Sequence, residues 1–210
     1  MSLSATELDA TGAEIRVLCI AGSPRRGGNS ERLLDAFVRG VNNAGGLAEK
    51  VVVVDYRIAP CRGCNSCSDT GTCIVKDRMH EVYGLIDSAD AIVISSPVYF
   101  ATVPAVLKAL YDRCQPYWAR IYIQGEARPP KRPGGLLLVG GGGDPFGASC
   151  AVTTTKSVLA VLGVQYEVEL EVEGPDAAGD IDDHADVLKR AEDLGSETVV
   201  KAREYRSRER

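Results

Sequence analysis

The chain has 210 residues, of which 45 % are hydrophobic and 25 % are charged, and its formal net charge at pH 7 is −5. These proportions are typical of a folded globular protein and exclude a collagen, a coiled coil or a disordered chain. The negative charge disfavours a nucleic-acid-binding protein, which needs a basic face. No apolar run reaches the roughly 18 residues that suggest a membrane span.

The length predicts a single domain. Residues 1–13 contain acids but no basic cluster followed by a long apolar run, so a signal peptide is not predicted. We expect a disordered tail over residues 1–13, one domain over residues 14–205 and a short tail over residues 206–210. The lack of an export signal indicates the cytoplasm, where thiols stay reduced.

Short apolar runs alternate with amphipathic segments along the chain. Strands are predicted over residues 15–21, 51–54, 91–94, 136–139 and 167–173. Helices are predicted over about residues 29–44, 77–88, 104–114 and 146–162, with a final helix near the C-terminus. We expect the cysteine-rich segment 60–77 to be a loop and the proline-rich segment 116–134 to be irregular.

Five strands interleaved with helices predict an α/β fold, in which a doubly wound parallel sheet carries helices on both faces. The common strand order for this count is 2-1-3-4-5. Glutamates alternate with apolar residues over 167–173, which is typical of an edge strand. Ligands of such sheets bind beyond the carboxyl ends of the strands. The loops after the first, third and fourth strands should therefore line the site.

The first of these loops, residues 22–30, is rich in glycine and leads into a helix. Backbone N–H groups and the positive end of the helix favour a phosphate there. The loop lacks the Gly-x-Gly-x-x-Gly and Walker patterns, so a terminal monophosphate is favoured over a dinucleotide or a nucleoside triphosphate. The residues that we expect to hold this phosphate are Ser23, Arg25, Gly28, Asn29 and Ser30.

The other two loops suit a flat ligand. The loop after the third strand offers a stiff proline and an apolar wall, and the loop after the fourth strand allows close backbone approach through its glycines. The residues that we expect to face a planar heteroaromatic ring are Pro97, Val98, Tyr99, Phe100, Gly140, Gly141 and Gly142.

Two segments, Gly-Ser-Pro-Arg-Arg-Gly-Gly-Asn-Ser over 22–30 and Ser-Pro-Val-Tyr-Phe over 96–100, resemble the NADPH-dependent FMN reductase and flavodoxin-like families. Lys108 and the pair Asp112-Arg113 add to the resemblance, which covers roughly residues 14–165. The resemblance implies a flavodoxin-like fold that binds FMN, with the phosphate in the first loop and the ring near the other two. It implies no catalytic side chain, because the cofactor carries the chemistry.

Four cysteines, Cys61, Cys64, Cys67 and Cys73, have the spacing C-x₂-C-x₂-C-x₅-C. Four thiolates so close in sequence can hold an iron–sulfur cluster, although ferredoxins use a shorter last spacing. A zinc ion and metal-free thiols are the alternatives. The spacing resembles that of the iron–sulfur flavoproteins, a branch of the same family, which implies a [4Fe–4S] cluster.

The remaining cysteines, Cys19, Cys114 and Cys150, are expected to be small core residues.

These features predict an FMN-dependent oxidoreductase that passes electrons between NAD(P)H or a ferredoxin, a [4Fe–4S] cluster, FMN and a small acceptor. The alternatives are a cluster-free NAD(P)H-dependent FMN or quinone reductase, a non-catalytic flavodoxin-like electron carrier, and a zinc-stapled nucleotide-binding module. The resemblance also suggests a homodimer or homotetramer. Segment 116–134 would then be a subunit contact or a substrate lid.

Overall fold

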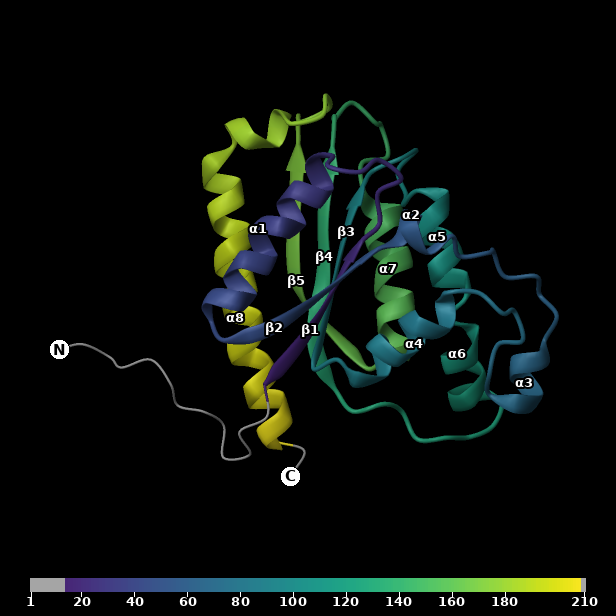
Figure 1. Ribbon diagram of the computed structural model, residues 1–210. Coiled ribbons are helices and arrows are strands. Elements are labelled where there is room, and N and C mark those ends of the chain that lie inside the picture. The colour runs from purple at the N-terminus through teal and green to yellow at the C-terminus, as the bar shows by residue number, and fades with distance from the viewer. Residues whose placement is uncertain (1–13, 209–210) are drawn as a thin grey trace.

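The computed structural model describes residues 14–208, so the tail predicted over 1–13 and residues 209–210 lie outside the described part. Its centre is a five-stranded parallel sheet of order β2-β1-β3-β4-β5 (Figure 1). The strands are β1 (Ile15–Ala21), β2 (Gly46–Val52), β3 (Ala91–Pro97), β4 (Arg132–Gly140) and β5 (Val164–Glu173). The predicted fold class, the strand order and the edge position of the last strand are confirmed.

Helices cover both faces of this sheet (Figure 1). One face carries α1 (Asn29–Asn43) and α8 (Ala185–Arg208), and the other carries α4 (Met79–Ser88), α5 (Ala105–Asp112) and α7 (Ser149–Val161). Shorter helices are α2 (Val53–Tyr56), α3 (Ser66–Thr70), α6 (Gln115–Tyr122) and the 3₁₀ turn η1 (Asp180–Asp183). Within residues 14–208, no helix is both long and apolar enough to cross a membrane.

The sheet separates two apolar cores because successive residues of a strand point to opposite faces. Val17 packs with Phe37 of α1 and Val199 of α8, whereas its neighbour Leu18 packs in the other core with Leu107 of α5. Both layers therefore fix the ends of the strands from which the loops of the predicted site emerge.

Outside the cysteine-rich segment, the structure differs from the predicted elements in three main places. The second strand, predicted over 51–54, is β2 over 46–52. It ends at Val52, opposite Ala21 at the end of β1, and the chain then turns into α2. Segment 116–134 is not irregular throughout: α6 occupies its first part and β4 begins at Arg132. Pro116 fits the first turn of α6, where a missing N–H costs nothing. The third difference is that α8 continues to Arg208, so the tail predicted from residue 206 begins inside this helix.

Helices α1 and α8 approach closely at two glycines, and we expect Gly40→Ala to destabilise the protein. A β-carbon on Gly40 would lie 1.8 Å from the Glu192 carbonyl oxygen, and one on Gly195 would lie 2.1 Å from that of Phe37. Backbone atoms cannot move aside unless the helices separate, so Gly40→Ala should lower the free energy of unfolding by about 3 kcal/mol.

Urea denaturation measures this change. The matched control is Gly84→Ala in α4, where an added β-carbon meets nothing within 4 Å. The control should raise the free energy of unfolding by up to about 1 kcal/mol, because alanine is the better helix former. Similar effects of the two substitutions would contradict the close crossing.

Candidate functional site

The loop between β1 and α1 forms a cradle at the carboxyl edge of the sheet. Ser23, Asn29 and Ser30 are buried there, whereas Arg25 is exposed. Gly28 is the N-cap of α1, and no side chain at the cap accepts a hydrogen bond from the start of the helix. The backbone N–H groups of the first turn have no partner within the helix either. These donors and the helix dipole favour a bound anion.

Two adjoining cavities lie at this edge. A cavity of about 90 Å³ at the cradle shares Val98, Gly140, Gly141 and Asp176 with a second cavity of about 380 Å³. The first is lined by Ser23, Arg25, Gly28, Asn29, Ser30, Pro97, Val98, Tyr99, Gly140 and Gly141. The second adds Phe100 and Gly142. The structure therefore brings all twelve residues predicted for the phosphate and the ring to one place, and the room there is suitable for a cofactor.

The segment that follows β5 also lines the site, although it was not predicted there from the sequence. Pro175 and Asp176 line the smaller cavity. Asn29 holds this segment in place: its Nδ2 donates to the Ala177 carbonyl oxygen at 2.8 Å, and its Oδ1 accepts from Gly179 N at 3.0 Å. The Asn29 amide, predicted as a phosphate ligand, thus lines the cavity while tying down the loop that closes it.

The larger cavity has an acidic rim that was also missed. Its lining includes Asp144, Glu171, Glu173 and Asp176. Glu171 and Glu173 belong to the alternation of glutamates with apolar residues in β5. This alternation, together with the edge position of β5, was the sequence pattern from which the acidic rim could have been predicted.

The turn after β3 holds two residues in the left-handed region. Tyr99 and Thr102 exchange backbone hydrogen bonds of 2.8 and 3.1 Å, and between them Phe100 has φ 50° and Ala101 has φ 60°. Glycine or asparagine usually occupies such positions, and other residues cost of order 1–3 kcal/mol each. The Phe100 side chain is also 96 % exposed at the rim of the cavity. Strain retained at such a place is typical of a functional site.

Glu31, in the first turn of α1, is a buried carboxylate beside the cradle. Burial favours its neutral form, but a hydrogen bond from Gly27 N at 2.7 Å and an ion pair with Lys50 at 3.0 Å outweigh it. The pKa of Glu31 is therefore held below its ordinary value. The folded state binds this proton less readily than the unfolded chain, so Glu31 stabilises the fold above the unfolded pKa of about 4.3.

We expect the free energy of unfolding of Glu31→Gln to fall less steeply than that of the wild type as the pH is lowered. The stabilisation by Glu31 is lost as pH falls through its lowered folded-state pKa, so wild type and variant should differ most near neutral pH and converge once the pH is below that pKa. Urea denaturation across this range measures the difference. Glu126→Gln, at an exposed position, is the control and should track the wild type. A constant difference between Glu31→Gln and the wild type at every pH would contradict this role.

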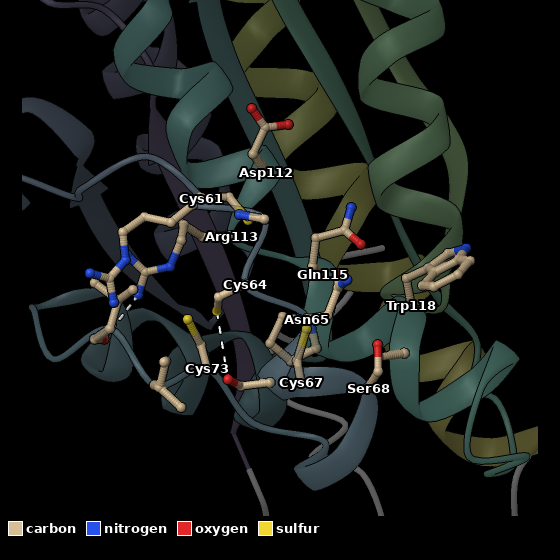
Figure 2. Close-up of a pocket in the computed structure, with 17 residues that line it drawn as sticks. Cys61, Cys64, Asn65, Cys67, Ser68, Cys73, Asp112, Arg113, Gln115 and Trp118 are labelled. Atoms are coloured by element: carbon tan, nitrogen blue, oxygen red, sulfur yellow. Dashed lines mark hydrogen bonds between the residues drawn. The ribbon is translucent and has the colours of Figure 1, made fainter.

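The four clustered cysteines surround a third cavity, of about 360 Å³ (Figure 2). They lie on the loop between α2 and α4, and the ends of α5 and α6 complete the wall with Arg113 and Trp118. The loop expected over 60–77 contains the short helix α3, a correction to the prediction. None of the residues that line this cavity also lines either of the other two.

The loop supplies hydrogen-bond donors to its sulfur atoms. Gly63 N donates to Cys61 Sγ at 3.5 Å, and hydrogen bonds from Ser66 lower the pKa of Cys64. Burial raises the pKa of Cys67, and the three neighbouring thiols add to this effect. The loop turns sharply at left-handed positions, among them Asn65 with φ 60° and Gly71 with φ 67°.

All seven cysteines are free thiols. Within residues 14–208, no three His, Cys, Asp or Glu side chains lie close enough together to hold a metal ion. Four thiols around one cavity fit a zinc ion or an iron–sulfur cluster in donor chemistry, provided that the loop tightens around it. Of the other cysteines, Cys19 and Cys114 are buried as predicted, whereas Cys150 is exposed, because it lies on the outer side of α7.

Comparison with known proteins agrees with this geometry. The family model described as NADPH-dependent FMN reductase matches residues 15–172. An iron–sulfur flavoprotein of Archaeoglobus fulgidus is 33 % identical over 182 residues, which cover 87 % of this chain and 78 % of that protein. An iron–sulfur flavoprotein of Methanocaldococcus jannaschii is 37 % identical over 126 residues, 60 % of this chain and 62 % of that protein.

Among solved structures, an NAD(P)H:quinone oxidoreductase from Methanothermobacter marburgensis superposes with a TM-score of 0.63 at 19 % identity, over 88 % of this chain and 96 % of that one. This likeness shows that the fold is flavodoxin-like. The family match, which spans most of the chain, then gives the identity. The chain belongs to the NADPH-dependent FMN reductase family and is an FMN-containing oxidoreductase related to the iron–sulfur flavoproteins.

Proposed function

We propose that the protein is an iron–sulfur flavoprotein that takes electrons from NAD(P)H or a ferredoxin and passes them, through FMN and a [4Fe–4S] cluster, to a small acceptor. The observation that carries this proposal is the gathering of four free thiols around one cavity in a chain of an FMN-binding family. FMN exchanges two electrons as hydride or one at a time, so it can connect a hydride donor to a one-electron cluster.

The FMN phosphate would lie at the uncapped first turn of α1, against Ser23, Arg25, Gly28 and Ser30. The ring would lie along residues 97–100, with the glycines of residues 140–142 allowing its edge to approach the backbone. Asn29 would act mainly through the closing segment that it holds.

The cluster would be held by Cys61, Cys64, Cys67 and Cys73. Three successive cysteines separated by two x₂ spacings suit a compact cluster better than two separated zinc-binding pairs. The amide donors at Cys61 and Cys64 would stabilise thiolate ligands and tune the reduction potential.

The acceptor should be neutral or cationic. Asp144, Glu171, Glu173 and Asp176 border the larger cavity and would repel an anion. We expect a neutral quinone to be reduced faster than its sulfonated analogue. The variant Glu171→Gln should lower the ratio of the two reduction rates. Equal rates for the two quinones in the wild type would contradict an acidic acceptor site.

We also propose a homodimer or homotetramer. Phe100 and Phe146 are 96 % and 76 % exposed on the loops beside the flavin cavities, and a second copy of the chain would cover them. Trp118 lines the cysteine cavity and Tyr122 is exposed beyond it, so α6 is a second candidate contact. The free thiols are consistent with a reducing compartment, and we place the protein in the cytoplasm.

Anaerobic purification followed by an absorption spectrum and by flavin, iron and sulfide counts tests the function. The expected result is one FMN with about four irons and four sulfides per chain. FMN without iron would favour the cluster-free reductase, and bound zinc without sulfide the zinc-stapled module. NAD(P)H oxidation without an added partner would exclude a non-catalytic carrier. A protein that binds neither flavin nor iron would refute the proposal.

A further inference from the structure

Arg113, which follows α5, fastens both ends of the cysteine loop. Its side chain is fully buried, with 0 % exposure. Nη1 donates to the Ala59 carbonyl oxygen at 3.0 Å and to Asp77 Oδ2 at 2.7 Å. Nη2 donates to the Val75 carbonyl oxygen at 3.2 Å and to Asp77 Oδ1 at 3.0 Å. Ala59 precedes Cys61, whereas Val75 and Asp77 follow Cys73, so one guanidinium ties the two stems together.

The hydrogen bonds of this guanidinium leave one donor over. An arginine has five N–H groups. Four are used in the bonds to Ala59, Val75 and Asp77, and the fifth, on Nε, is buried without a partner. A buried donor without a partner costs about 1–3 kcal/mol, which a structure rarely tolerates without a reason.

The cysteine cavity supplies that reason. Arg113 lines it together with the four cysteines, and Figure 2 shows its side chain on the side where Cys73 lies. Burial opposes the charge of Arg113, but the hydrogen bonds with Asp77 and the nearby Tyr83 and Cys73 raise its pKa, so the guanidinium is permanently charged. A fixed cation with a free donor is thus placed beside sulfur ligands.

We propose that Arg113 is a positioning residue of the cluster site, in which Nη1 and Nη2 fix the loop stems and Nε–H donates a hydrogen bond to Cys73 Sγ or to a cluster sulfide. The donation to a sulfide rests on the proposed function, whereas the fixing of the loop does not. Because reduction adds negative charge to a cluster, a buried cation beside it stabilises the reduced form and raises the reduction potential.

The test compares Arg113→Lys and Asp77→Asn with the wild type. Arg78→Lys is the matched control, because Arg78 is exposed next to the same loop and pairs with Glu81 instead. The first readout is Co²⁺ affinity of the metal-free protein, followed by the sulfur-to-cobalt absorption band. The second is the cluster potential from anaerobic redox titration, with FMN content and far-UV circular dichroism as checks of the fold.

We expect Arg113→Lys to bind Co²⁺ about 10- to 100-fold more weakly than the wild type, the usual effect of losing an outer-sphere partner. Lysine keeps the positive charge but lacks the Nε–H, so the cluster potential of this variant should also shift to a more negative value through the loss of the hydrogen bond to sulfur. Asp77→Asn should lose affinity in the same direction, because it loosens the stems while keeping the Nε–H, and Arg78→Lys should match the wild type.

Unchanged Co²⁺ affinity and potential in Arg113→Lys would overturn the proposal. If that variant does not fold, Asp77→Asn decides, and wild-type Co²⁺ affinity there would overturn the fixing of the loop. A wild type that binds Co²⁺ but takes up no iron and sulfide would refute the cluster, and with it the sulfide bond, while the cobalt comparison would still decide the role of Arg113 in the loop.

Discussion

Replacing Cys61, Cys64, Cys67 and Cys73 together by serine should remove all iron and sulfide from the protein and leave its FMN content unchanged. Thiolates are the ligands that iron–sulfur clusters require, and a serine hydroxyl is not ionised at neutral pH. None of the four side chains belongs to an apolar core, so the fold should persist. The cavity that they surround shares no lining residue with the flavin cavities, so FMN should still bind.

Counts of iron, sulfide and flavin after anaerobic reconstitution measure this outcome. Cys150→Ser is the matched control, because Cys150 is an exposed free thiol far along the chain on α7. It should keep both cofactors. Wild-type iron in the quadruple variant would refute the assigned ligands. If instead the variant keeps its NAD(P)H oxidation rate with every acceptor, the cluster-free reductase becomes the better description.

Local sequence patterns were sufficient to predict most of the fold and the three loops that line one part of the site. β1 ends just before Gly22-Ser23-Pro24 and β3 ends at Pro97, and parallel strands bring the loops that follow such ends to the same edge of the sheet. This is why residues from three separate loops could be predicted as neighbours without any knowledge of their contacts.

The parts that could not be predicted depend on contacts between distant segments. Asn29 holds Ala177, which is 148 residues away, and nothing local in the segment after β5 indicates that it folds back over the cradle. Arg113 reaches Ala59 across 54 residues, and in the sequence it was only part of a family motif on a helix. The prolines of segment 116–134 suggested irregular structure, but Pro116 lies in the first turn of α6, where proline is tolerated.

Gly28→Asp should weaken FMN binding at least a hundredfold while leaving α1 as stable as before or more so. Aspartate is a preferred N-cap residue, and its carboxylate would accept hydrogen bonds from the first-turn N–H groups that no side chain now caps. There is room for it, because a β-carbon on Gly28 comes no closer than 3.5 Å to Arg25. The substitution therefore fills, with a fixed negative charge, the place proposed for the phosphate.

The size of the effect follows from the repulsion between the two anions. Unit charges about 4 Å apart repel by roughly 4 kcal/mol at an effective dielectric constant near 20, and each 1.4 kcal/mol is tenfold in affinity. Titration with FMN and with riboflavin separates this repulsion from a general loss of the pocket, because riboflavin lacks the phosphate and should bind both proteins alike. Gly28→Ala, which adds the same β-carbon without the charge, should retain most of the FMN affinity. If Gly28→Asp bound FMN as tightly as Gly28→Ala does, the phosphate would have to lie away from the start of α1, and the proposed orientation of the flavin would be wrong.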